Sequence, residues 1–222
     1  MAWAKVQSTL QRVASGANAK AFASSNTAGN CLIARVLLES DSATVSSLVN
    51  SSGTAWTAIG SLLGGGNGYR AQLYYAKNCA GGANTVTLTP STGASELTIY
   101  EFSGLDTAAP FEAAPSPNVN SGTGTTADSG NLTTLGADRL LFGFGVSNQQ
   151  LSTGSGFTTQ ENNNFNFSSW DETKNAATAG VYSAFEPVAS SNAWIMGAAA
   201  FKEAGGAPPV VARRGLMMMG VG

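Results

Sequence analysis

The stretch "SELTIYEFSG" (residues 95–104) is the clearest guide to the fold, because apolar and polar side chains alternate along it. A similar alternation runs through "YRAQLYYAKN" (residues 69–78). Successive side chains of a β-strand point to opposite faces of the sheet, so this pattern predicts strands. It places Leu97, Ile99 and Glu101 on one face.

Glu101 is the carboxylate of greatest interest, because it shares that face with two apolar residues. A carboxylate in such a place is either a catalytic group or a structural one. We expect the structural role, either at the rim of a strand end or as the partner of Arg35 or Arg70.

The rest of the chain has the same pattern of short strand-forming segments, and helical periodicity is almost absent. Short runs rich in Val, Ile, Leu, Thr, Tyr and Phe are separated by clusters of Gly, Asn and Ser. Such a sequence predicts an all-β fold, an antiparallel β-sandwich that is jelly-roll-like. The expected strands lie near 2–8, 19–24, 30–38, 43–49, 55–60, 69–77, 84–89, 95–103, 125–134, 138–146, 156–160, 165–173, 179–185 and 193–202.

Two series of segments occur in the same order in the two parts of the chain. The first runs from "NCLIARVLLES" to "SELTIYEFSGL" and the second from "DRLLFGFGVSN" to "NAWIMGAAAFKE". We interpret residues 1–203 as one sandwich domain, with two pseudo-repeated halves at 1–109 and 124–203 and a crossing connection over 106–130. The alternative is two small domains separated in the proline-rich stretch 110–117.

Composition narrows the classes of function. Charged residues make up 11% of the 222 residues and the formal net charge is −2. A chain with no basic surplus is not expected to bind nucleic acid, and weak repulsion between copies favours self-association. The opening "MAWAKVQSTLQR" lacks the apolar run of a signal peptide, and no segment approaches a membrane span. We therefore expect folding in the cytoplasm and no contact with membranes.

The sequence offers little for catalysis or metal binding. It contains no histidine, which removes the usual triads and the commonest metal ligand. Cys31 and Cys79 cannot complete a zinc site by themselves, and we expect them to be free thiols rather than a disulfide. No cofactor and no enzymatic activity are expected. A glycosidase built on two carboxylates such as Glu101 and Asp171 is the least favoured class.

The segment "QENNNFNFSSW" (160–170) permits a second kind of site. Aromatic faces beside planar amides are what carbohydrate sites use, although the same alternation also describes a half-buried strand with Phe165 and Phe167 in the core. The candidate stacking platforms for a glycan are Trp56, Tyr69, Phe165 and Trp170.

The chain ends in "GGAPPVVARRGLMMMGVG" (205–222), which is apolar and positively charged. The Gly-Gly pair predicts a hinge and the two prolines an extended step, so we expect residues 204–222 to form an extended arm. Methionine adapts to irregular surfaces, which suits docking on another subunit. The expected interface residues are Val210, Val211, Arg213, Arg214, Leu216, Met217, Met218 and Met219.

The order of the segments resembles a group of β-sandwich proteins found in bacteria and in tailed-phage genomes. The resemblance covers nearly the whole chain, through "GNCLIARVLL", "GTAWTAIG", "LTIYEFSGLD", "DRLLFGFGV", "WIMGAAAFKE" and "ARRGLMMMGVG". It implies a jelly-roll-like sandwich used in virion or surface structures. It carries over no functional residues.

These expectations combine into one function and one alternative. The first is a non-enzymatic virion structural protein of a tailed phage, foremost a capsid decoration protein, which assembles with other copies of itself and with the major capsid or tail protein. The alternative is a carbohydrate-binding module of a phage fibre or tail or of a bacterial adhesin.

Overall fold

The structure, a computed structural model, describes residues 2–64, 68–112, 119–164 and 166–205. Within these ranges the chain forms strands and no helix, and so it has no helix there that could cross a membrane. The strands are β1 (Ala4–Val13), β2 (Asn18–Ala21), β3 (Cys31–Leu38), β4 (Val45–Asn50), β5 (Thr57–Gly64), β6 (Arg70–Ala76), β7 (Thr85–Pro90), β8 (Ser95–Ser103), β9 (Val119–Asp128), β10 (Leu132–Thr134), β11 (Arg139–Ser147), β12 (Thr158–Asn163), β13 (Ser168–Ala176), β14 (Gly180–Tyr182) and β15 (Phe185–Lys202).

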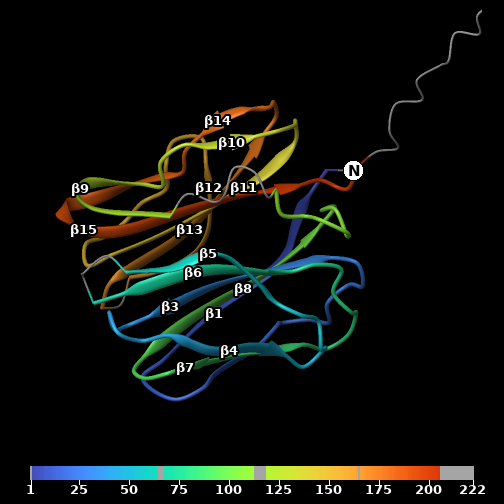
Figure 1. Cartoon of the computed structure of the whole chain (residues 1–222), viewed down its shortest axis with the longest axis horizontal. Helices are drawn as coiled ribbons and strands as arrows, with labels where there is room; N and C mark the ends of the chain where they lie inside the picture. Colours follow the sequence, from blue (N-terminus) through green and yellow to red (C-terminus); the bar gives the residue numbers. More distant parts are fainter. Residues whose placement is uncertain (1, 65–67, 113–118, 165, 206–222) are drawn as a thin grey trace, which may run out of the picture.

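The strands form four stacked sheets (Figure 1). Two five-stranded antiparallel sheets, β1-β8-β3-β6-β5 and β12-β13-β11-β15-β9, lie face to face in the middle. A three-stranded sheet, β2-β7-β4, covers the outer face of the first, and the pair β10-β14 lies over the outer face of the second. The all-β, antiparallel sandwich predicted from the sequence is confirmed.

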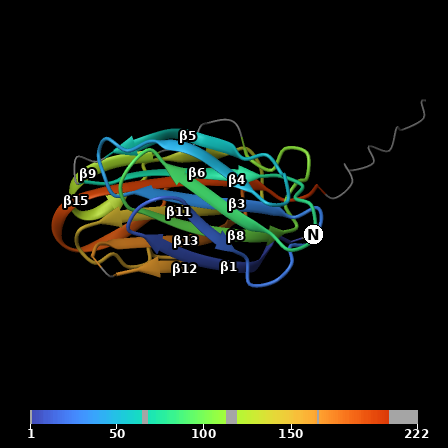
Figure 2. The ribbon, with the colours of Figure 1, turned by 90° about the horizontal axis from the view of Figure 1, so that it is seen from below.

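The two five-stranded sheets have corresponding strand orders. Reading β9-β15-β11-β13-β12 against β1-β8-β3-β6-β5 aligns β11 with β3 and β15 with β8. These are the strands that open and close the two series of segments in the sequence. Seen after a quarter turn, β1 lies near β12 and β5 near β9, so the edges of the two sheets coincide (Figure 2).

The middle strands are buried on both faces because each large sheet lies between two cores. All eight residues of β3 are buried. Ile33 and Leu37 face the central core, whereas Leu32 and Val36 face the outer core of the first half. A strand buried on both sides is a nearly continuous apolar run, as "CLIARVLL" is apart from Arg35.

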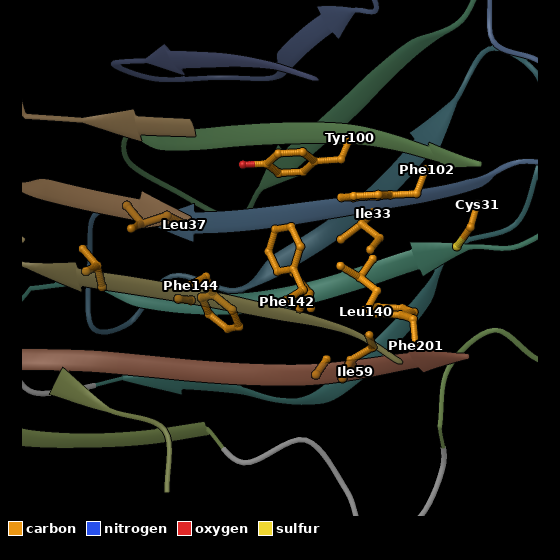
Figure 3. Close-up of a cluster of buried hydrophobic side chains, with 14 of the residues drawn as sticks. Cys31, Ile33, Leu37, Ile59, Tyr100, Phe102, Leu140, Phe142, Phe144 and Phe201 are labelled. Atoms are coloured by element: carbon orange, nitrogen blue, oxygen red, sulfur yellow. The ribbon is translucent and has the colours of Figure 1, made fainter. Parts of the chain in front are cut away.

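The central core is aromatic and joins the two halves (Figure 3). Tyr100 and Phe102 of β8 meet Phe142 of β11, and the rings of Tyr100 and Phe142 make an edge contact with centroids 5.0 Å apart. The connection between the halves is also tied to β15, because Lys202 N donates a hydrogen bond to Pro110 O. Each half therefore supplies one wall of the same core.

Three sequence predictions about strands are wrong. The connection expected over 106–130 contains strand β9, and the strand expected over 125–134 is the end of β9 plus β10. Strand β9 is rich in glycine and threonine and therefore lacks the apolar pattern of a strand. Its Gly122 leaves room for a ring, because a Cβ there would lie 2.7 Å from Cζ2 of Trp194. In addition, β15 begins at Phe185 rather than near 193.

Candidate functional site

The residues expected to form a subunit interface all lie in the C-terminal arm. Residues 206–222, and hence Val210 to Met219, are outside the described part of the chain, as is Phe165. Their predicted roles stay predictions.

The other three candidate stacking residues lie in different parts of the molecule. Trp56 packs against the outer core of the first half, and Trp170 packs against the outer core of the second half. Tyr69 packs against the central core, with its ring centroid 4.9 Å from that of Phe167. Trp170 also donates a hydrogen bond from Nε1 to Thr153 Oγ1 at 3.0 Å. The three described rings therefore form no common platform.

Glu101 is fully buried and its carboxylate is enclosed by donors. It accepts hydrogen bonds from the side chains of Gln7, Asn26 and Asn30 and from the backbone N–H of Thr27, at 2.6–2.8 Å. Although burial raises its pKa, these hydrogen bonds lower it, and the net shift is below the ordinary value. The predicted structural role and the shared face with Leu97 and Ile99 agree with this geometry, whereas the suggested pairing with Arg35 or Arg70 is wrong.

Arg35 lies at the centre of a buried charged cluster between the two large sheets. Its Nη1 is 2.7 Å from Glu96 Oε1 and its Nε is 2.7 Å from Asp171 Oδ1, and none of the three side chains is exposed. Tyr100 donates a hydrogen bond to Asp171 Oδ2, and Ser169 donates one to Glu96 Oε1. The cluster thus combines residues of β3 and β8 with residues of β13.

The electrostatics of this cluster are those of one cation shared by two anions. Burial raises the pKa of Asp171 to about 6, more than Arg35 lowers it. Burial also lowers the pKa of Arg35, but Asp171 and Glu96 raise it to a net value above the ordinary one. Arg35 stays charged, and the sealed position leaves no room for a substrate between the carboxylates.

A second pair of buried carboxyls lies in the sheet that contains Asp171, on the face turned away from the central core. Glu172 accepts a hydrogen bond from Gly154 N at 2.7 Å, but its Oε1 has no partner among the described residues. Glu186 is fully buried and both of its oxygens lack a hydrogen-bond partner there. The carboxyl groups occupy space left open by Gly143 and Gly145 of β11. Burial raises the pKa of Glu172 to about 7 and, together with Glu172 itself, raises that of Glu186 well above its ordinary value.

One end of the sandwich carries a hollow lined by carboxamides. Its volume is about 280 Å³. The connection after β11 supplies Asn148, Gln149 and Gln150, and the β12–β13 hairpin supplies Asn164 and Asn166. Phe167 and Ser168, both buried, also line it. We call this site the amide hollow.

The remaining candidates for chemistry are structural. Cys31 and Cys79 are both buried free thiols, as expected. The pKa of the Cys31 thiol is raised by burial, which makes it unreactive. No group of three or more Cys, Asp or Glu side chains suitable for a metal ion occurs in the described ranges.

Sequence reasoning missed the Arg35 cluster, and it pointed to only one wall of the amide hollow, through the segment 160–170. Arg35 was considered only as a partner for Glu101, although an arginine inside "CLIARVLL" signals a buried counter-charge. The Asn-Gln-Gln run at 148–150 carried no signal of its own. Comparison with family models, with curated proteins and with solved structures finds no match to this chain.

Proposed function

We propose that the chain is a non-enzymatic structural protein of a tailed-phage virion, foremost a capsid decoration protein. The observation that carries the proposal is the use made of its carboxylates. Glu101 and Asp171, the two carboxylates that the sequence analysis considered for a glycosidase, are fully buried and bound by the protein's own donors. Their oxygens bind groups of neighbouring strands and sheets, so these carboxylates serve the fold.

The architecture supports an assembly role in a second way. The body consists of four antiparallel sheets with aromatic and charged contacts at its centre, and the formal net charge of −2 makes the chain nearly neutral. Such a chain gives little electrostatic repulsion between copies.

The two-stranded sheet β10-β14 carries two exposed apolar residues suited to contact with a neighbour. Leu135 and Val181 are 65% and 62% exposed, and Val181 is paired with Thr133, two residues before Leu135. Large apolar side chains standing side by side on a surface are typical of contact sites.

The C-terminal arm is the second element of the proposed assembly. We propose that residues 208–222 dock on a neighbouring subunit, with Leu216 and Met217 to Met219 buried there. Burying apolar surface contributes roughly 25 cal/mol per Å², so four such side chains supply several kcal/mol before ordering costs are subtracted.

The test compares the full chain with a chain lacking residues 207–222. We expect both to unfold at nearly the same temperature, and only the full chain to join particles of the phage that encodes it. A full-length variant with Leu216 and Met217 to Met219 changed to Ser keeps the arm's length and should also fail to join. A full chain that remains monomeric by sedimentation and binds neither procapsids nor tails contradicts the proposal.

A further inference from the structure

We propose that the amide hollow is a binding site for a neutral saccharide. This goes beyond the assembly role, and it moves the expected glycan site away from Trp56, Tyr69 and Trp170. The argument rests on the chemistry, stiffness and size of the hollow.

The lining matches the hydrogen-bonding character of sugar hydroxyls. A carboxamide offers both donors and acceptors, as a hydroxyl group does. The side-chain amides of Gln149, Gln150 and Asn166 take part in no hydrogen bond among the described residues, and no charged residue lines the hollow. A neutral ligand rich in hydroxyl groups suits this lining better than an ion.

The floor of the hollow is the edge of the central core. Phe167 is 3% exposed and is backed by the ring of Tyr69. The ring closes the bottom of the hollow but leaves no open face for stacking, so a bound saccharide would be held by hydrogen bonds to the amides.

The walls are held in place by the buried hydroxyl of Ser168. Its Oγ accepts a hydrogen bond from Leu151 N at 2.9 Å and donates one to Asn164 Oδ1 at 2.6 Å, so it links the two segments that form the hollow. Gln150 is fixed as well, because its backbone O accepts a hydrogen bond from Ala189 N. A site that is already ordered loses less entropy when a ligand binds.

The size fits a single sugar unit. A volume of about 280 Å³ lies just below the range of small-molecule sites, which run from roughly 300 to 1,000 Å³. The hollow is therefore suited to the terminal unit of a glycan rather than to an extended chain.

The experiment screens the full chain on an array of neutral and acidic glycans. Titration calorimetry then follows with the best neutral saccharide. We expect Gln149→Ala with Gln150→Ala to weaken binding at least tenfold, which corresponds to about 1.4 kcal/mol. Asn131→Ala, an exposed amide outside the hollow, serves as the matched control and should bind like the parent chain.

Three results would overturn the assignment. One is an array without a neutral glycan above background, the second is a preference for acidic glycans, and the third is binding that survives the double substitution. Thermal unfolding of each variant checks that the fold is intact; because Gln149 and Gln150 lie at the surface end of the sandwich, we expect no change. Ser168 is buried and links two segments, so its removal can disturb the local fold. Ser168→Ala is therefore used only as a second variant, which should weaken binding by loosening Asn164.

Discussion

Arg35 of the first half and Asp171 of the second half form an ion pair at 2.7 Å between the two large sheets, where neither side chain is exposed. Transferring these charges from water has a high free-energy cost, which the attraction offsets only when the geometry is good. The pair therefore fixes how the halves are aligned more than it adds to stability. Tyr100 reinforces it through its hydrogen bond to Asp171.

Removing the cation should be severely destabilising. We expect Arg35→Met to lower the free energy of unfolding by about 3–5 kcal/mol, because Glu96 and Asp171 would be left buried without a partner. Urea denaturation at neutral pH measures the loss. Adding Glu96→Gln and Asp171→Asn to the same chain should restore part of it.

The matched control is Arg12→Met, since Arg12 pairs with Glu39 near the surface. This partly exposed pair keeps contact with solvent, so its loss should cost about 1 kcal/mol, well below the cost of losing the buried cation. Equal losses for Arg12→Met and Arg35→Met would show that the buried cluster has no special role.

Stability should fall as the pH rises, because of Glu172 and Glu186. A carboxyl whose folded pKa is raised favours folding fully below its ordinary pKa and loses that contribution as the pH rises through the folded value, about 7 for Glu172. Among the charged groups nearby, Asp171 raises the pKa of both carboxyls, whereas Lys174 lowers that of Glu172 and Arg35 lowers that of Glu186. We expect the free energy of unfolding to drop by about 3 kcal/mol between pH 4.5 and pH 8 from Glu172 alone, and Glu186 lowers it further in the same direction.

The variant Glu186→Gln tests the source of that drop. It keeps the shape but cannot ionise, so it should be more stable than the parent chain at pH 8 and close to it at pH 5. Asp138→Asn, at an exposed position, should leave the pH profile unchanged. A parallel profile for parent and Glu186→Gln chains would exclude Glu186 as the cause.

The donors around Glu101 should make it sensitive to loss of charge. Glu101→Gln turns an NH₂ group toward N–H donors, and we expect a loss of roughly 2–3 kcal/mol at pH 7. Because the folded pKa of Glu101 is lowered, its contribution is present above the ordinary pKa and is lost as the pH falls through the folded value. The difference between the two chains should therefore shrink in acid, as followed by thermal unfolding. Glu161 accepts a hydrogen bond from the hydroxyl of Ser8, so Glu161→Gln should lower the free energy of unfolding by less at pH 7.

Gly197 should not tolerate a methyl group. It lies opposite Phe144 in the β11–β15 pair, and a Cβ at Gly197 would overlap the Phe144 ring. We expect Gly197→Ala to lower the free energy of unfolding by about 1–3 kcal/mol through overpacking. At Gly180 the nearest atom to a new Cβ is 3.7 Å away, so Gly180→Ala should cost much less in the same denaturation experiment.

Local patterns predicted most of the strands but few of the partners. Alternation in 95–103 correctly gave the face shared by Leu97, Ile99 and Glu101, because strand geometry is local. The donors to Glu101 come from Gln7 and from the loop after β2, and no local signal names such contacts. Strand β9 was missed because its glycines accommodate Trp194, a residue far along the chain.

Local reasoning pointed to one wall of the amide hollow, the segment 160–170, but not to the other. Its walls are the connection after β11 and the β12–β13 hairpin, and the sequence alone does not show that Ser168 joins them. Trp56, Tyr69 and Trp170 instead pack against three different cores, because a large ring is more often packed inside than displayed.

The shared central core has a consequence for synthesis on the ribosome. When β1 to β8 have emerged, the face that carries Ile33, Tyr100 and Phe102 has no cover, and Arg35 has no Asp171. That wall can close only after β11, β13 and β15 have been made, since these strands supply the opposite wall. A nascent first half with an open aromatic face is prone to aggregate, so chaperone binding in this interval would protect the yield of folded chain.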